Sequence, residues 1–134
     1  MMRILIYGVT VGIILHGLIH LLGFVAYWPL VEIAELPYKT SLLSGRLTLG
    51  EAGMRLFSVL WLLVAVGLVG SAAGLATGQS WWLPVMMIAV VVSLVITVLD
   101  WSQAFRGAMV SLLLLGVLLV VVGLRQQPRP FSAH

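Results

Sequence analysis

Four long apolar runs constrain this chain more than any other feature of its sequence. They cover about residues 4–28, 51–77, 81–101 and 104–124. Each run is close to the roughly 20 residues that a helix needs to cross the hydrocarbon core of a bilayer. Because lipid offers no partner to backbone N–H and C=O groups, runs of this length predict helices. We therefore expect an all-α, four-helix transmembrane bundle with antiparallel neighbours.

The composition agrees with this class of protein. Of 134 residues, 62% are hydrophobic and only 8% are charged, and none is cysteine. Soluble domains carry roughly 25% charged residues. Without cysteine, disulfides and thiolate metal sites are excluded. Seven scattered Lys and Arg residues produce the net charge of +3. They are too few for a nucleic-acid surface, so we expect a lipid bilayer, and no nucleic acid, around this chain.

The connections between the runs indicate a single membrane domain, residues 1–125, followed by a mobile tail, residues 126–134. The one long connection contains Pro29–Leu36, in which apolar and acidic residues alternate, as is typical of a segment lying at the membrane interface. The links at residues 78–80 and 102–103 are short. Thr48 and Glu51 have the spacing of a capping box, which predicts the start of the second helix.

The basic residues bear on orientation and anchoring. Lys39, Arg46, Arg125 and Arg129 are interpreted as interface anchors whose charged ends reach water. Arg55 and Arg106 fall at the ends of two predicted spans, where we expect them to be structural. Leaving these two out of the count of positive charges places both termini in the cytoplasm.

Two histidines stand out in the first apolar run. His16 and His20 are four residues apart, about one helical turn, so their imidazoles share a face. Gly8 and Gly12 extend this face, which predicts that it turns toward protein and not toward lipid. Gly70, Gly74 and Gly107 also predict close helix packing.

In an antiparallel bundle the other polar residues of the spans fall in the same half of the membrane as these histidines. A charge at bilayer depth costs roughly 2.5–3.5 kcal/mol, so such groups pair with one another or line a wet cavity. We expect an acidic and a basic member to form an ion pair, either acid with either arginine, and the histidines to hydrogen-bond into the network. The members of this predicted network are Glu51, Arg55, Ser93, Thr97, Asp100, Arg106 and Ser111.

Several ligands are compatible with the histidine pair. Side chains that point the same way cannot be the two axial ligands of one haem, so a bis-histidine haem needs a second copy or subunit, because the remaining histidine, His134, lies in the tail. A single-histidine haem or pigment, a metal bound in cis with Glu51 or Asp100, and a quinone or proton relay all stay open. Gly17 follows His16, so the metalloprotease motif HExxH is absent.

Three stretches carry a resemblance to a known family. His16–Phe24 reads HGxxHLxGF, Trp81 and Trp82 open the third run, and Trp101–Gly107 reads WSxAxxG. In these stretches the chain resembles small four-span bacterial membrane proteins of unknown function. Gln103 stands where such proteins often have an acidic residue. The resemblance implies a multi-pass protein of the bacterial inner membrane and favours His16, His20 and Trp101 as site residues, but it implies no reaction.

Two functional hypotheses follow. The leading one is a non-enzymatic integral membrane protein, an accessory or scaffold subunit of a larger membrane complex or of an oligomer. The alternative is a small membrane protein that binds a cofactor or ligand through His16 and His20 for electron or proton transfer. Ser93, Thr97 and Ser111 are ordinary membrane-helix hydroxyls, so nucleophilic catalysis is not expected.

Overall fold

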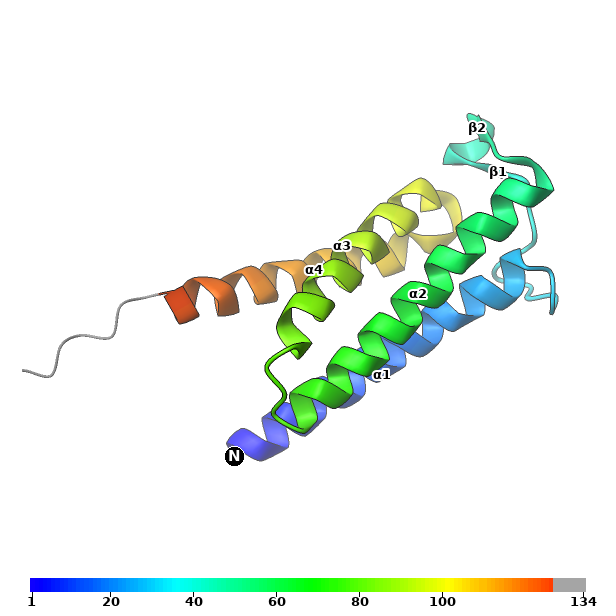
Figure 1. Cartoon of the computed structure of the whole chain (residues 1–134). Coiled ribbons are helices and arrows are strands. Elements are labelled where there is room, and N and C mark those ends of the chain that lie inside the picture. The colour runs from blue at the N-terminus through cyan, green and yellow to red at the C-terminus, as the bar shows by residue number, and fades with distance from the viewer. Residues whose placement is uncertain (127–134) are drawn as a thin grey trace, which may run out of the picture.

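Helices make up about four fifths of the described part of the chain, residues 1–126 of this computed structural model. Each of the four is long and apolar enough to cross a membrane. The predicted all-α bundle with antiparallel neighbours is therefore confirmed (Figure 1). Its helices are α1 (Met2–Tyr27), α2 (Gly50–Ala76), α3 (Trp82–Leu99) and α4 (Trp101–Gln126). Of the predicted tail, residues 127–134 lie outside the described residues, and Gln126 is the last residue of α4.

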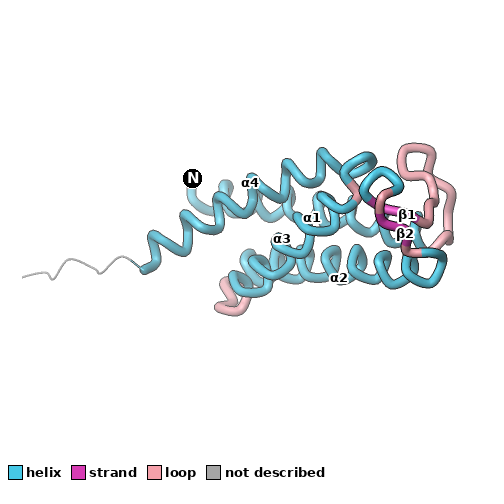
Figure 2. The backbone as a smooth tube through the Cα atoms, turned by 90° about the horizontal axis from the view of Figure 1, so that it is seen from above, coloured by secondary structure: helices cyan, strands magenta, loops and turns pink. Residues whose placement is uncertain are grey.

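The two ends of the bundle differ in their connections. The long connection between α1 and α2 lies at one end, whereas the N-terminus and the short link from α2 to α3 lie at the other (Figures 1 and 2). We call these the loop end and the terminal end. At the terminal end α2 stops because Gly78 adopts a left-handed φ of +72°, and the N–H of Gln79 then donates to the carbonyl of Gly74.

A small hairpin in the long connection was not predicted. Strands β1 (Ser41–Leu42) and β2 (Leu47–Thr48) pair antiparallel around the short 3-10 helix η1 (Leu43–Gly45). The predicted capping box is wrong, because Thr48 pairs with Ser41 in this hairpin and no side chain caps α2. Instead the carbonyl of Thr40 accepts from the first N–H groups of the helix.

The link between α3 and α4 is shorter than predicted. Only Asp100 separates the two helices, and the expected turn at residues 102–103 is already part of α4. The carbonyl of Asp100 accepts from the N–H groups of Gln103 and Ala104, which holds these residues in a helical turn. The backbone bends at Ala104, where φ is −117°, and the predicted start of the fourth helix coincides with this bend.

Each helix packs against the next one in the chain, and α1 and α4 share few close backbone contacts. The buried share of each helix agrees with these contacts. In the most apolar stretch of α2, 44% of the residues are buried, against 17% in α4. The seam between α1 and α4 is therefore the most open part of the bundle.

Candidate functional site

A chain of hydrogen bonds joins α1, α3 and α4 in the half of the bundle nearer the loop end. Nε2 of His16 lies 3.4 Å from Oγ of Ser111, which lies 2.7 Å from Oγ of Ser93. Oγ of Ser93 lies 2.7 Å from Nε2 of His20, whose Nδ1 lies 3.0 Å from the carbonyl oxygen of His16. All four side chains are buried. The structure thus brings the two predicted histidines together with two of the predicted hydroxyls.

Thr97, another member of the predicted network, is buried beside this chain of hydrogen bonds. Its hydroxyl donates to the carbonyl of Ser93, 2.7 Å away on the same helix. Such a bond satisfies the hydroxyl locally. Thr97 therefore contributes to the wall of the site and does not extend the chain of hydrogen bonds.

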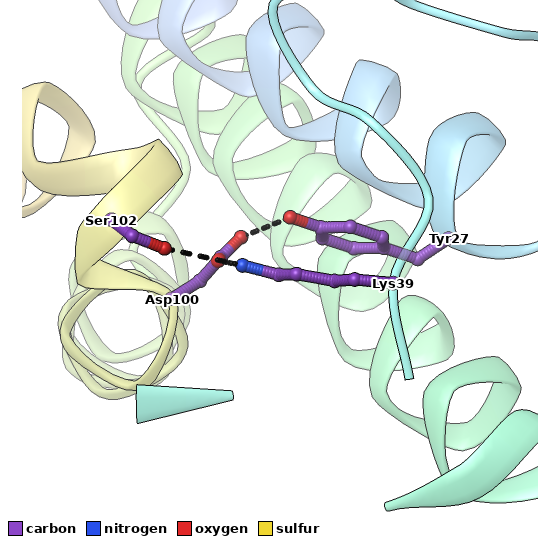
Figure 3. A network of polar contacts seen from close by, with 4 residues as sticks. All are labelled: Tyr27, Lys39, Asp100 and Ser102. Carbon is purple, nitrogen blue, oxygen red and sulfur yellow. Dashed lines mark hydrogen bonds and ion pairs between the residues drawn. The ribbon is translucent and has the colours of Figure 1, made fainter. Parts of the chain in front are cut away.

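A second polar cluster ties the loop end together. The carboxylate of Asp100, 0% exposed, accepts from the Tyr27 hydroxyl and forms an ion pair with Lys39. The ammonium of Lys39 also donates to Ser102, 3.4 Å away. Figure 3 shows Tyr27 and Lys39 converging on the aspartate from α1 and from the long connection. The cluster therefore fixes this connection against the link between α3 and α4.

The expected ion pair is wrong in its basic partner. Asp100 pairs with Lys39, which the sequence suggested was an interface anchor, whereas Glu51, Arg55 and Arg106 are exposed. The first turn of α2 leaves its two charged side chains outside the bundle, and the long connection folds back and delivers the lysine. Sequence spacing could not show this, because Lys39 lies 61 positions from Asp100.

A pocket of about 410 Å³ opens beside the histidines. Side chains from all four helices and from the long connection line it, and most of the lining is apolar. Glu35 and Arg106 contribute charged side chains to its walls, while His16, His20 and Trp61 contribute rings. It therefore combines an apolar interior with a few polar groups, as small-molecule sites do.

Trp61 lines this pocket, although the sequence did not indicate it as a site residue. Its ring centroid lies 5.2 Å from that of His20, and the His20 centroid lies 4.6 Å from that of His16. The indole Nε1–H is buried and has no hydrogen-bond partner among residues 1–126. Gly23 makes this position possible, because a Cβ there would overlap the indole ring.

The predicted packing glycines divide into two groups. Gly74 and Gly107 lie close to neighbouring side chains: a Cβ on Gly107 would be 3.1 Å from Thr97. Among residues 1–126, no neighbouring atom lies within 4 Å of a Cβ built on Gly8, Gly12 or Gly70. The predicted face of α1 turns inward at His16 and His20, but the close contact of α1 with α2 uses Gly17 and Gly23. The HGxxHLxGF pattern contains both of these glycines, and reading them as packing residues would have found this contact.

The donor set of the site does not form a multidentate metal site. Within residues 1–126 no group of three or more His, Asp or Glu side chains is placed to hold a metal ion. Both ring nitrogens of His20 already have partners, and so do both oxygens of Asp100. A metal ion held in cis by the two histidines, or by Asp100, would have to break these bonds, so the arrangement is suited to hydrogen bonding and proton exchange.

Comparisons of the chain with protein-family models, with curated proteins and with solved structures found no match. The fold therefore defines the class: this chain is a multi-pass integral membrane protein. Its polar site lies in the half of the bundle nearer the loop end.

Proposed function

We propose that this protein binds a small amphipathic molecule in the pocket that the four helices and the long connection line beside His16 and His20. The pocket volume of about 410 Å³ lies within the roughly 300–1,000 Å³ range of ligand sites. The open seam between α1 and α4 provides a route by which such a molecule enters from the bilayer. This function belongs to the second sequence-based hypothesis, ligand binding at His16 and His20.

The observation that carries the proposal is the position of the pocket, whose mostly apolar lining includes both histidines of the buried chain of hydrogen bonds. Sites for small molecules combine such an apolar lining with a few polar groups that fix the orientation of the ligand. Here the adjacent His16 and His20 would orient the polar end of that ligand.

A role in proton transfer follows from the same arrangement. Two imidazoles joined through two hydroxyls can exchange protons with a ligand, because each group both donates and accepts. Of the ligands compatible with the sequence, a hydrogen-bonding amphiphile of the quinone or phenol type therefore fits better than a metal held in cis by both histidines.

The experiment is ligand recovery from protein purified gently in native lipid. A Val110→Trp variant fills the pocket from α4, and Leu113→Trp places the same side chain on the same helix outside the pocket. Mass spectrometry of extracts should find an amphiphile at about one per chain in the wild type and in Leu113→Trp, and lose it in Val110→Trp. Finding none in any sample, or equal amounts in all three, would contradict the proposal.

The accessory-subunit hypothesis is favoured by one different observation. Gly8 and Gly12 form a small-xxx-small pair on α1, and no neighbouring atom of residues 1–126 lies within 4 Å of a Cβ built on either. In membranes such pairs let a second helix approach closely. A partner subunit or a second copy would then pack on α1.

Cross-linking in native membranes tests this second function. Gly12→Leu should abolish a cross-linked species that Ala73→Leu, on an exposed position of α2, leaves intact. A monomer without any partner in the wild type would contradict it.

We further propose that the chain belongs with the small four-span bacterial proteins that it resembles, and that it lies in the inner membrane with cytoplasmic termini.

A further inference from the structure

The hydrogen-bond partners of His20 assign its tautomer. Its Nδ1 lies 3.0 Å from the backbone carbonyl of His16. A carbonyl oxygen only accepts, so this nitrogen carries the hydrogen. A neutral imidazole has a single N–H, and Nε2 is then an acceptor. The Ser93 hydroxyl, 2.7 Å away, must donate to it.

The assignment continues along the chain of hydrogen bonds to His16. Ser93 has one hydroxyl hydrogen, which His20 receives, so Ser111 must donate in the 2.7 Å contact between the two serines. The Ser111 oxygen can then only accept from His16, whose Nε2 lies 3.4 Å away. His16 therefore carries its hydrogen on Nε2, and the two histidines are opposite tautomers.

The reverse arrangement leaves a contact without a hydrogen. If His16 carried its hydrogen on Nδ1, Ser111 would donate to Nε2 while Ser93 still donated to His20. The two serine oxygens would then face each other at 2.7 Å with lone pairs only. With both imidazoles neutral, every contact in the chain of hydrogen bonds therefore contains a hydrogen only when His16 carries its hydrogen on Nε2.

One consequence concerns the pocket. In the complete arrangement Nδ1 of His16 is a bare acceptor, and the structure provides no donor to it among residues 1–126. Among residues 1–126, the buried side-chain atoms that have neither a hydrogen-bond partner nor accessible surface are Thr10 Oγ1 and Trp61 Nε1, and Nδ1 of His16 is not one of them. His16 lines the pocket. The site therefore offers a ligand an acceptor on His16, whereas the indole N–H of Trp61 is sealed from the pocket.

We propose that the polar end of the ligand is a hydroxyl group, of a phenol, a quinol or an alcohol, which donates to Nδ1 of His16. This inference rests on the proposed ligand-binding function. A hydroxyl supplies the hydrogen that this nitrogen lacks, whereas a carbonyl or an ether only accepts and leaves the histidine unpaired.

The first test reads the tautomers without any ligand. Nitrogen-15 spectra of histidine-labelled protein in bilayers distinguish protonated from bare ring nitrogens. We expect Nε2–H on His16 and Nδ1–H on His20. A His16→Gln variant identifies the resonances by subtraction. Finding the hydrogen of His16 on Nδ1 would overturn the inference and leave the proposed function standing.

The second test compares two probes, 4-octylphenol and 4-octylanisole, in the second of which a methyl group replaces the hydroxyl hydrogen. Binding is followed by the fluorescence of Trp61 in a variant whose other tryptophans are phenylalanine. We expect the phenol to bind about tenfold more tightly, the ratio that one well-formed hydrogen bond supplies. The ratio should fall to near one in His16→Ala.

Ser111→Ala sharpens this second test. Without the Ser111 oxygen, His16 is free to move its hydrogen to Nδ1, so the preference for the phenol should decrease while the pocket remains. Ser58→Ala is the matched control, because this buried serine donates to the carbonyl of Arg55 and takes no part in the chain of hydrogen bonds. Equal binding of the two probes to the wild type would overturn the hydroxyl inference, and binding of neither would overturn the proposed function with it.

Discussion

The two halves of this bundle are held together by different means. Toward the loop end, side-chain hydrogen bonds cross between helices, from His16 to Ser111 and from His20 to Ser93. Toward the terminal end, the buried Ser71 bonds mainly within its own helix, to the carbonyl of Leu68. There the contacts come from small residues: a Cβ built on Gly67 would meet Ala89 at 3.0 Å.

The difference shows how a membrane bundle specifies its arrangement. Lipid tails are as apolar as leucine, so burial of apolar surface does not distinguish one helix face from another. In the half nearer the loop end, polar partners add to close contacts such as that of Gly23 with Trp61 in defining which faces meet, whereas in the other half close fit of small residues defines it. In the polar half this specificity depends on buried groups that need hydrogen-bond partners. The pocket lies in the same half.

Removing the carboxylate of Asp100 should have the largest effect. Asp100→Ala leaves the Tyr27 hydroxyl and the Lys39 ammonium without their shared acceptor. We expect the free energy of unfolding to fall by about 3 kcal/mol, because a half-broken ion pair is costly. Denaturation in mixed micelles measures this. Asp100→Asn, which keeps an acceptor, should lose less, and equal losses would contradict the importance of the charge.

Filling Gly23 should come next. A Cβ there overlaps the Trp61 ring, so Gly23→Ala is expected to cost about 2 kcal/mol and to shift the tryptophan fluorescence. Gly12→Ala, on the same helix with open space around it, is the matched control and should leave stability nearly unchanged. A harmless Gly23→Ala would show that the indole is not fixed by this contact.

The comparison of the two halves is tested most directly by two serines. Ser93→Ala removes a bond from His20 and another from Ser111, and should cost about 1 kcal/mol. Ser71→Ala removes a bond to its own helix and a weak contact with the sulfur of Met86, and should cost much less. Similar losses of unfolding free energy in both variants would remove the distinction between the halves.

The smallest effects should come from the exposed charges. Glu51→Gln and Arg106→Gln change side chains without an ion-pair partner among residues 1–126. Neither should alter stability measurably in the same denaturation assay. A clear loss of unfolding free energy in either variant would indicate that this side chain takes part in an ion pair, as the sequence suggested.

Much of this arrangement was predictable, because length and apolar composition leave a chain in lipid few alternatives to helices. The four spans were placed within a few residues of their ends. The shared face of His16 and His20 followed from helical geometry, and the polar residues were correctly expected in the half nearer the loop end. These are local properties, since each depends on spacing within one helix or on its direction.

The contacts between different helices, in contrast, could not be predicted from the sequence. The sequence by itself determined four membrane helices and a polar half with two histidines on one face. Only the tertiary structure decided that Asp100 meets Lys39, that Gly23 and not Gly12 receives a neighbour, and that Trp61 lines the pocket. The reason is physical: the rotation of each helix about its axis, and the path of the long connection, depend on the sum of many contacts between segments that are distant in sequence.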